Sequence, residues 1–95
     1  MTTIHDVPRP AAQQPTTIEL RLDLPEPQTR VGVKVAGGTR VGTLGRADAV
    51  LGRHTWAAKH HWQEGGPGDE ATIFEFDEPL PAGPVVLRIP FSPKV

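Results

Sequence analysis

The chain has 95 residues, 22% of them charged, and a formal net charge of −1. It lacks cysteine, which excludes disulfides, thiolate metal sites and a cysteine nucleophile. Its apolar runs are far shorter than the roughly 20 residues of a membrane-spanning helix, and its first residues lack the pattern of a secretory signal. We therefore expect one small cytoplasmic domain with no membrane partner.

Proline and glycine are frequent, with 11 and 10 residues, which raises the question of disorder. Residues 1–16 contain Pro8, Pro10 and Pro15 among polar residues, without an apolar period. Proline fixes φ and restricts the residue before it, so we predict a flexible, proline-rich tail over residues 1–16. Residues 17–95 are predicted to form a single β-sandwich domain.

The first strand is predicted over residues 18–24, where apolar and charged residues alternate and indicate one buried face. Pro25 and Pro27 end it. Alternation resumes over residues 30–36 and is followed by Gly37-Gly38. Because a type I′ turn needs positive φ at both central positions, this pair predicts a hairpin into residues 39–44.

The middle of the chain allows more than one interpretation. Residues 46–51 could form one helical turn closed by Gly52, or a loop. Residues 54–62 are too short for an independent helix and lack an apolar stripe, so we favour a strand. As a regular strand, this segment would place five residues on one face: His54, Trp56, Ala58, His60 and Trp62.

The last third of the chain predicts two more strands. Residues 71–77 place Thr72, Phe74 and Phe76 on one face, with Ile73, Glu75 and Asp77 on the other. After a rigid connector over residues 78–84, alternation continues over residues 85–91, where Pro90 indicates a sheet edge. Five or six short strands without a long helix predict an all-β fold, a small antiparallel β-sandwich of immunoglobulin-like type.

Residues 73–92, IFEFDEPLPAGPVVLRIPFS, resemble a hairpin of the N-terminal β-domain of aminopeptidase-N-type zinc aminopeptidases. In that family, a strand ending in an F-D-E-P-L-P-A-G-like connector leads into an apolar strand. Residues 18–31 of this chain are loosely similar to an earlier strand pair of the same domain. Those enzymes hold zinc on an H-E-x-x-H helix in a separate domain, and this sequence has no such motif. The resemblance implies a β-sandwich without peptidase activity.

Charge is segregated along the chain. Residues 30–59 contain six basic residues and one acidic residue, whereas residues 64–78 contain six acidic residues and no basic one. We expect these segments to pair between solvent-facing strands of one molecule; stacking between molecules is the alternative. The acidic segment and a sequence pI of about 6.4 argue against a nucleic-acid partner.

Histidines and tryptophans are the candidate binding residues. His60 and His61 are adjacent, so on a regular strand they point to opposite faces and cannot bind one metal ion. His54 and His60 would lie roughly 20 Å apart, too far to share an ion without a bend. Trp56 and Trp62 could pack in the core or form a rigid interface contact.

Catalytic signals are weak. Ser92 is the only serine and has no G-x-S-x-G context. The acidic pairs at residues 69–70 and 77–78 are typical of solvated turns, and acid–base chemistry needs a carboxyl with a shifted pKa in a cleft. The glycines of residues 66–71 are followed by a predicted strand, so they do not fit a dinucleotide-binding turn. We therefore predict that the protein is not an enzyme.

These observations predict a non-enzymatic binding or accessory module that acts through protein–protein contacts or self-association. Its candidate binding residues are Trp56, His60 and Trp62. We expect no cofactor and no metal site. The alternative is a small-molecule or metal-binding β-protein that uses residues 54–62.

Overall fold

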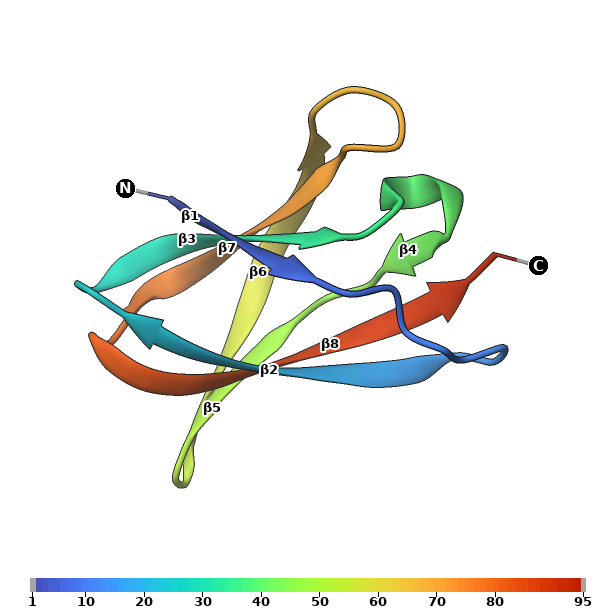
Figure 1. Ribbon diagram of the computed structural model, residues 1–95. Coiled ribbons are helices and arrows are strands. Elements are labelled where there is room, and N and C mark those ends of the chain that lie inside the picture. Colours follow the sequence, from blue (N-terminus) through green and yellow to red (C-terminus); the bar gives the residue numbers. More distant parts are fainter. Residues whose placement is uncertain (1, 95) are drawn as a thin grey trace.

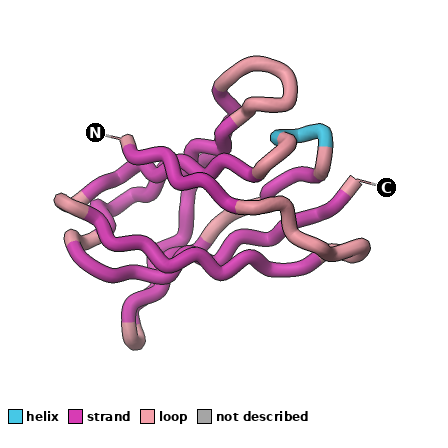
Figure 2. Tube along the Cα trace, in the orientation of Figure 1, coloured by secondary structure: helices cyan, strands magenta, loops and turns pink. Residues whose placement is uncertain are grey.

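A computed structural model describes residues 2–94 as an all-β domain (Figure 1). This part of the chain contains one short 3₁₀ turn, Gly38–Arg40, and no helix long and apolar enough to cross a membrane (Figure 2). The strands are β1 (Thr3–Val7), β2 (Thr16–Leu24), β3 (Gln28–Val35), β4 (Gly42–Leu44), β5 (Asp48–Leu51), β6 (His54–Glu64), β7 (Ala71–Leu80) and β8 (Gly83–Pro93).

The strands form one curled sheet in the order β1-β3-β7-β6-β5-β8-β2, with β4 also paired to β8. Strand β6 is the middle strand of this order and changes partner along its length: residues 54–57 pair with β5, and residues 58–64 pair with β7. In Figure 1 it rises from the tip that it shares with β5 to the loop before β7. It thereby joins a β3–β7 half (β1, β3, β7 and residues 58–64) to a β8 half (residues 54–57, β5, β8, β4 and β2).

The two halves face each other across a single apolar core. Each strand supplies alternate residues to it, as the period of a strand requires. The β8 half contributes mainly β2 and β8, and the β3–β7 half mainly β3 and β7. The largest fully buried side chains are Phe74, Phe76, Phe91, Leu80, Leu87, Ile89, Val31, Val33 and Val85.

The all-β prediction is confirmed, but the immunoglobulin-like sandwich is not. The sheet is continuous through β6 and curls into a half-barrel. It is also mixed, because β1 runs parallel to β3 while the other pairs are antiparallel. The antiparallel prediction therefore holds for every pair of described strands except the one that contains the N-terminal segment.

That N-terminal segment departs from the predicted flexible tail. Thr3 to Val7 pair in register with Val31 to Val35, and Val7 is buried. The Thr3 hydroxyl donates to Gln28 Oε1 at 2.6 Å, and burial lowers the pKa of His5. Alternation of inward and outward residues is present in this stretch, but it is only five residues long and the prolines that follow obscured it.

The predicted hairpin at Gly37-Gly38 is wrong. Both glycines do adopt positive φ, 93° and 60°, but the chain then forms the 3₁₀ turn, and β4 pairs with β8. The β6–β7 loop locks this turn through Glu70. Its carboxylate accepts hydrogen bonds from the Thr39 backbone N–H at 2.9 Å, the Thr39 hydroxyl and the Gly68 N–H, and these bonds lower the pKa of Glu70 to about 2.

Two further predictions fail in the β8 half. Residues 48–51 form strand β5, not a helical turn or a loop. Pro90 lies in the middle of the sheet, because β8 has β2 on one side and β4 and β5 on the other. The proline is tolerated there because its backbone faces the gap between β4 and β5, where Gly45 N–H donates to Pro90 C=O at 2.8 Å.

Replacing Val7 tests whether the N-terminal segment is part of the sheet. Val7→Ala should lower the free energy of unfolding by about 1–2 kcal/mol, because it removes buried methyl groups from the core. Ile4, on the outer side of the same strand, is 47% exposed, and Ile4→Ala should cost less. Equal urea midpoints for wild type and Val7→Ala would contradict the docking of β1.

The carboxylate of Glu70 predicts a pH dependence of stability. A lowered pKa in the folded state means that its contribution is complete above the ordinary value of 4.5 and is lost as pH falls from there toward about 2. Glu70→Gln should be less stable than wild type at pH 7 and should lose less between pH 7 and pH 3. Urea unfolding at both values measures this, with exposed Glu78→Gln as the control.

Candidate functional site

The candidate site is the outer surface of the β3–β7 half. On β7, Phe74 and Phe76 point into the core while Ile73, Glu75 and Asp77 point to the outer side, as the alternation predicts, although Ile73 is covered there by its neighbours and is only 3% exposed. The partners opposite these outward residues share their face: Gly32 and Trp62 lie opposite Ile73, and Arg30 and His60 lie opposite Glu75. Three strands therefore bring these side chains together.

A β-bulge at Lys59 decides which residues of β6 join this surface. Ala58 lies opposite inward-facing Phe76, and His60 lies opposite outward-facing Glu75, so one extra residue interrupts the pairing. Before the bulge, Trp56 points inward, opposite buried Ala49, and packs against the core. After it, Trp62 points outward.

The predicted common face of His54, Trp56, Ala58, His60 and Trp62 is therefore wrong. The strand itself is confirmed, but the bulge divides these residues between the two surfaces of the sheet. Of the three candidate binding residues, His60 and Trp62 lie together on the outside and Trp56 does not join them. His54 stays with Trp56, their rings 4.1 Å apart.

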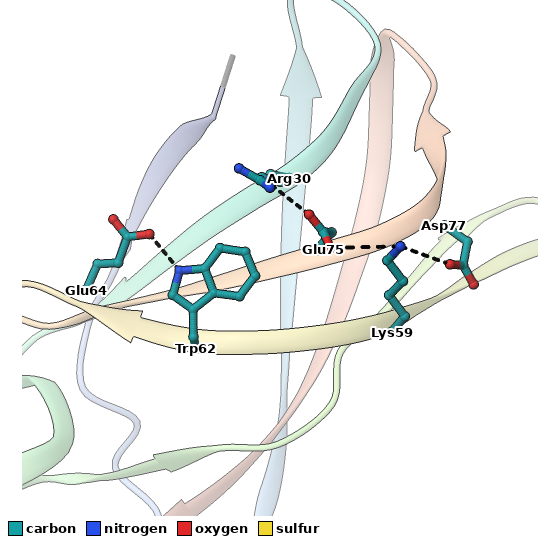
Figure 3. Close-up of polar contacts among 6 residues, drawn as sticks. All are labelled: Arg30, Lys59, Trp62, Glu64, Glu75 and Asp77. Carbon is teal, nitrogen blue, oxygen red and sulfur yellow. Dashed lines mark hydrogen bonds and ion pairs between the residues drawn. The ribbon is translucent and has the colours of Figure 1, made fainter.

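Trp62 is held in place from two sides (Figure 3). Its indole N–H donates to Glu64 Oε2 at 2.6 Å, and the Arg30 guanidinium lies 5.5 Å from the ring centroid. That distance is typical of a cation–π contact. These two contacts fix the orientation of the ring. Because the ring is also partly exposed, one part of it remains accessible to a partner.

Glu75 is the centre of the charged network beside Trp62 (Figure 3). Arg30 Nε donates to Glu75 Oε2 at 2.8 Å, and Lys59 Nζ lies 3.9 Å from Glu75 Oε1 and 3.4 Å from Asp77 Oδ1. The hydrogen bond from Arg30 and the positive charges of Arg30 and Lys59 lower the pKa of Glu75. The network keeps Glu75 ionised and fixes the guanidinium next to the indole.

An apolar row crosses the four strands in register with Trp62. It runs from Ile4 on β1 over Gly32 on β3 to Ile73 on β7 and Trp62 on β6. A Cβ on Gly32 would lie only 2.3 Å from Ile4 Cδ1 and 2.9 Å from Ile73 Cδ1, so the missing side chain lets the two isoleucines meet above the strand. We call the whole surface the Trp62 face: Ile4, Arg30, Gly32, Lys59, His60, Trp62, Ile73 and Glu75.

The predicted pairing of the basic and acidic segments is confirmed within one molecule. Ion pairs join Arg30 to Glu75, Lys34 to Asp69 and Lys59 to Asp77, and each links residues 30–59 to residues 64–78. All of these pairs lie on or beside the β3–β7 half. Charge segregation along the sequence is therefore satisfied inside the fold.

The histidines do not converge. His61 lies over Phe74, with ring centroids 5.9 Å apart, and His60 points to the opposite surface beside Glu75. Residues 2–94 contain no group of three or more His, Asp or Glu side chains placed to hold a metal ion. The small-molecule or metal-binding alternative requires His54, Trp56, His60 and Trp62 to share one face, and the bulge separates them.

Sequence reasoning missed several members of the Trp62 face. Alternation places Glu75 on the side of its strand opposite Phe74 and Phe76, but only the register between β3 and β7 shows that Glu75 meets Arg30 beside the indole. Ile4 lies within the predicted tail, so the sequence does not indicate that it joins a sheet. Gly32 has no side chain, so its role in the apolar row is not visible from residue type. The outward-facing residues of 71–77 are the sequence signal that points to this face. The residues opposite them on the neighbouring strands complete it, but identifying those residues requires the strand register.

No protein family, no curated protein and no solved structure gives a significant match to this chain. The resemblance to the β-domain of aminopeptidase-N-type enzymes stays a prediction.

Stability measurements can test the division made by the bulge. Trp56→Ala should cost about 2–3 kcal/mol, because its ring packs against the core, and Trp62→Ala should cost about 1 kcal/mol or less. Urea unfolding monitored by circular dichroism compares the two variants without relying on tryptophan fluorescence. A larger loss for Trp62→Ala would contradict the assigned faces.

Proposed function

We propose that the protein is a non-enzymatic binding module that recognises a protein partner through the Trp62 face. The observation that supports this proposal is a partly exposed tryptophan stacked with an arginine, next to an apolar row and beside an ion-pair network. Tryptophan and arginine are the residues most enriched where binding energy concentrates, and such anchors have polar surroundings that exclude water.

The fixed position of Trp62 favours binding. Ordering a flexible side chain at an interface costs about 0.5–1.5 kcal/mol. Glu64 and Arg30 already hold the indole, and Glu75 already holds Arg30, so the free protein has made these contacts before a partner arrives. The Trp62 face is therefore suited to contact without rearrangement.

The charges of the face indicate the chemistry of the partner. Arg30 and Lys59 are each paired with a carboxylate on the same surface, so a strongly acidic or basic partner would have to break these pairs. An apolar side chain could instead cover Trp62 and Ile4, which pack around the buried Ile73, while the ion pairs form the rim. We accordingly expect a protein surface with an apolar centre and mixed charge around it.

A capture experiment with two variants tests the proposal. Immobilised wild type should retain a partner from an extract of the cells that express the protein, and Trp62→Ala should weaken its affinity about 30-fold or more, as expected for a binding hot spot. Leu51→Ala is the control, because Leu51 is 43% exposed but lies at the β5–β6 turn, in the other half of the sheet.

Once a partner is identified, titration calorimetry with each variant gives the affinities. Unchanged affinity of Trp62→Ala, with the variant shown to be folded, would reject the Trp62 face as the binding surface. Retention of no specific protein by wild type would reject the proposed function itself.

A further inference from the structure

Strand β2 ends the sheet and leaves one of its edges without a partner strand. It pairs with β8 over all nine of its residues, from Thr16 opposite Phe91 to Leu24 opposite Gly83, without a register shift. Its other edge has no strand beside it among residues 2–94. A long, regular edge of this kind presents a row of free N–H and C=O groups.

The prolines of β8 show which groups of β2 face outward. Pro90 directs its backbone toward Gly45, away from β2, so Thr17 opposite it makes no ladder bond with β8. Alternation then gives the same orientation to Glu19, Arg21 and Asp23. Pro84 fits this pattern, because it lies opposite Asp23 and has no N–H to donate.

Proteins usually block an exposed edge with lysine, proline, a bulge or a very short strand. The other edge strand of the sheet, β1, has five residues and is soon followed by Pro8 and Pro10. Strand β2 is bounded by Pro15 and Pro25, but its own nine residues, TTIELRLDL, contain no lysine or proline, and its register is regular. Its only charges are Glu19, Arg21 and Asp23, which alternate in sign.

We propose that the partner of this edge is the β2 strand of a second copy of the chain. Antiparallel pairing centred on Leu20 uses the full strand, with Thr16 opposite Leu24 of the other copy. It places Glu19 opposite Arg21 twice, because the arrangement has two-fold symmetry. The sequence of this edge is thus complementary to itself in charge, and opposite charges at directly facing positions stabilise a strand pair.

The centre on Leu20 follows from comparing the possible registers. Shifting the centre to Arg21 would place arginine opposite arginine and Glu19 opposite Asp23, and both pairs repel. Centring on Leu22 would pair Arg21 with Asp23 but would leave residues 16–19 unpaired. A shift by one residue between the chains would place inward side chains opposite outward ones. Only the register centred on Leu20 combines full overlap with complementary charge.

Inner-face packing supports the same arrangement. Leu22 and Leu24 are buried within one molecule, whereas Ile18 and Leu20 on the same face are only partly buried. In the proposed pair, the two Leu20 side chains meet at the symmetry axis and Ile18 lies next to Leu22 of the other copy. The dimer therefore covers the apolar residues that the monomer leaves accessible at this edge.

Charge reversal tests the proposed pairing directly. Sedimentation velocity should show a concentration-dependent dimer for wild type. Glu19→Arg and Arg21→Glu should each raise the dissociation constant about tenfold or more, because each variant places like charges opposite each other twice. Mixing the two variants should restore a dimer, since every facing pair in the mixture is then of opposite charge. Circular dichroism checks that both variants are folded.

Single cysteines test the register, because the natural chain has none. Facing residues that do not share ladder bonds have Cα atoms about 4.5 Å apart, so Leu20→Cys should form a covalent dimer on mild oxidation. Leu22→Cys is the matched control, because its counterpart in the other copy would lie four residues along the strand. Cross-linking of Leu22→Cys in preference to Leu20→Cys would overturn the proposed register.

This inference uses a different surface from the Trp62 face and does not depend on it. Trp62→Ala should therefore form the dimer as wild type does, and loss of the dimer in this variant would contradict the use of β2. A wild-type chain that stays monomeric up to high concentration would overturn the proposal and would leave the edge to a strand of another protein.

Discussion

The arrangement of this small domain depends on the β-bulge at Lys59. Strand β6 must contribute to the core beside β5 and then to the surface beside β7, while the sheet curls around a single core. A regular strand cannot do both with this sequence, because its alternation would place Trp56 and Trp62 on the same side. The extra residue reverses the alternation, so that Trp56 packs inside and Trp62 lies outside, and it adds the local bend typical of bulges. The position of the candidate site and the closure of the core thus have the same cause.

The prolines of β8 obey a second constraint, which concerns hydrogen bonds. Proline has no backbone N–H and cannot donate a ladder hydrogen bond. It is therefore tolerated where the neighbouring strand offers no carbonyl acceptor at that position. Pro84 and Pro90 are an even number of residues apart and face the same side, away from β2. Strand β8 can therefore keep an uninterrupted ladder with β2 although it contains prolines. The break between β4 and β5 occurs on the other side, beside Pro90, so a residue that signals a sheet edge from sequence lies in the middle of the sheet.

The sequence predicted what depends on local alternation. The strands at residues 18–24, 30–36 and 71–77, the inward-facing Phe74 and Phe76, and the pairing of the two charged segments all follow from period-two patterns and from charge. It failed where a distant strand decides the outcome. Thr3–Val7 is ordered because β3 offers it an edge, and Gly37-Gly38 does not form a hairpin because β4 pairs with β8. The bulge at Lys59 leaves no mark in the composition of β6, so the Trp62 face could be predicted only in part.

The distribution of charge separates the two surfaces that the fold leaves available. On the β3–β7 half, Arg30, Lys59, Glu75 and Asp77 neutralise one another within the molecule, so that surface offers an aromatic anchor and little net electrostatic attraction. On β2, Glu19 lies 3.9 Å from Arg88, whereas Arg21 and Asp23 form no ion pair within residues 2–94. An edge whose charges alternate in sign selects a partner of the opposite pattern, and the antiparallel copy of the same strand is such a partner. Because the two surfaces lie at different parts of the sheet order, pairing through β2 would place two Trp62 faces on one assembly and leave both open.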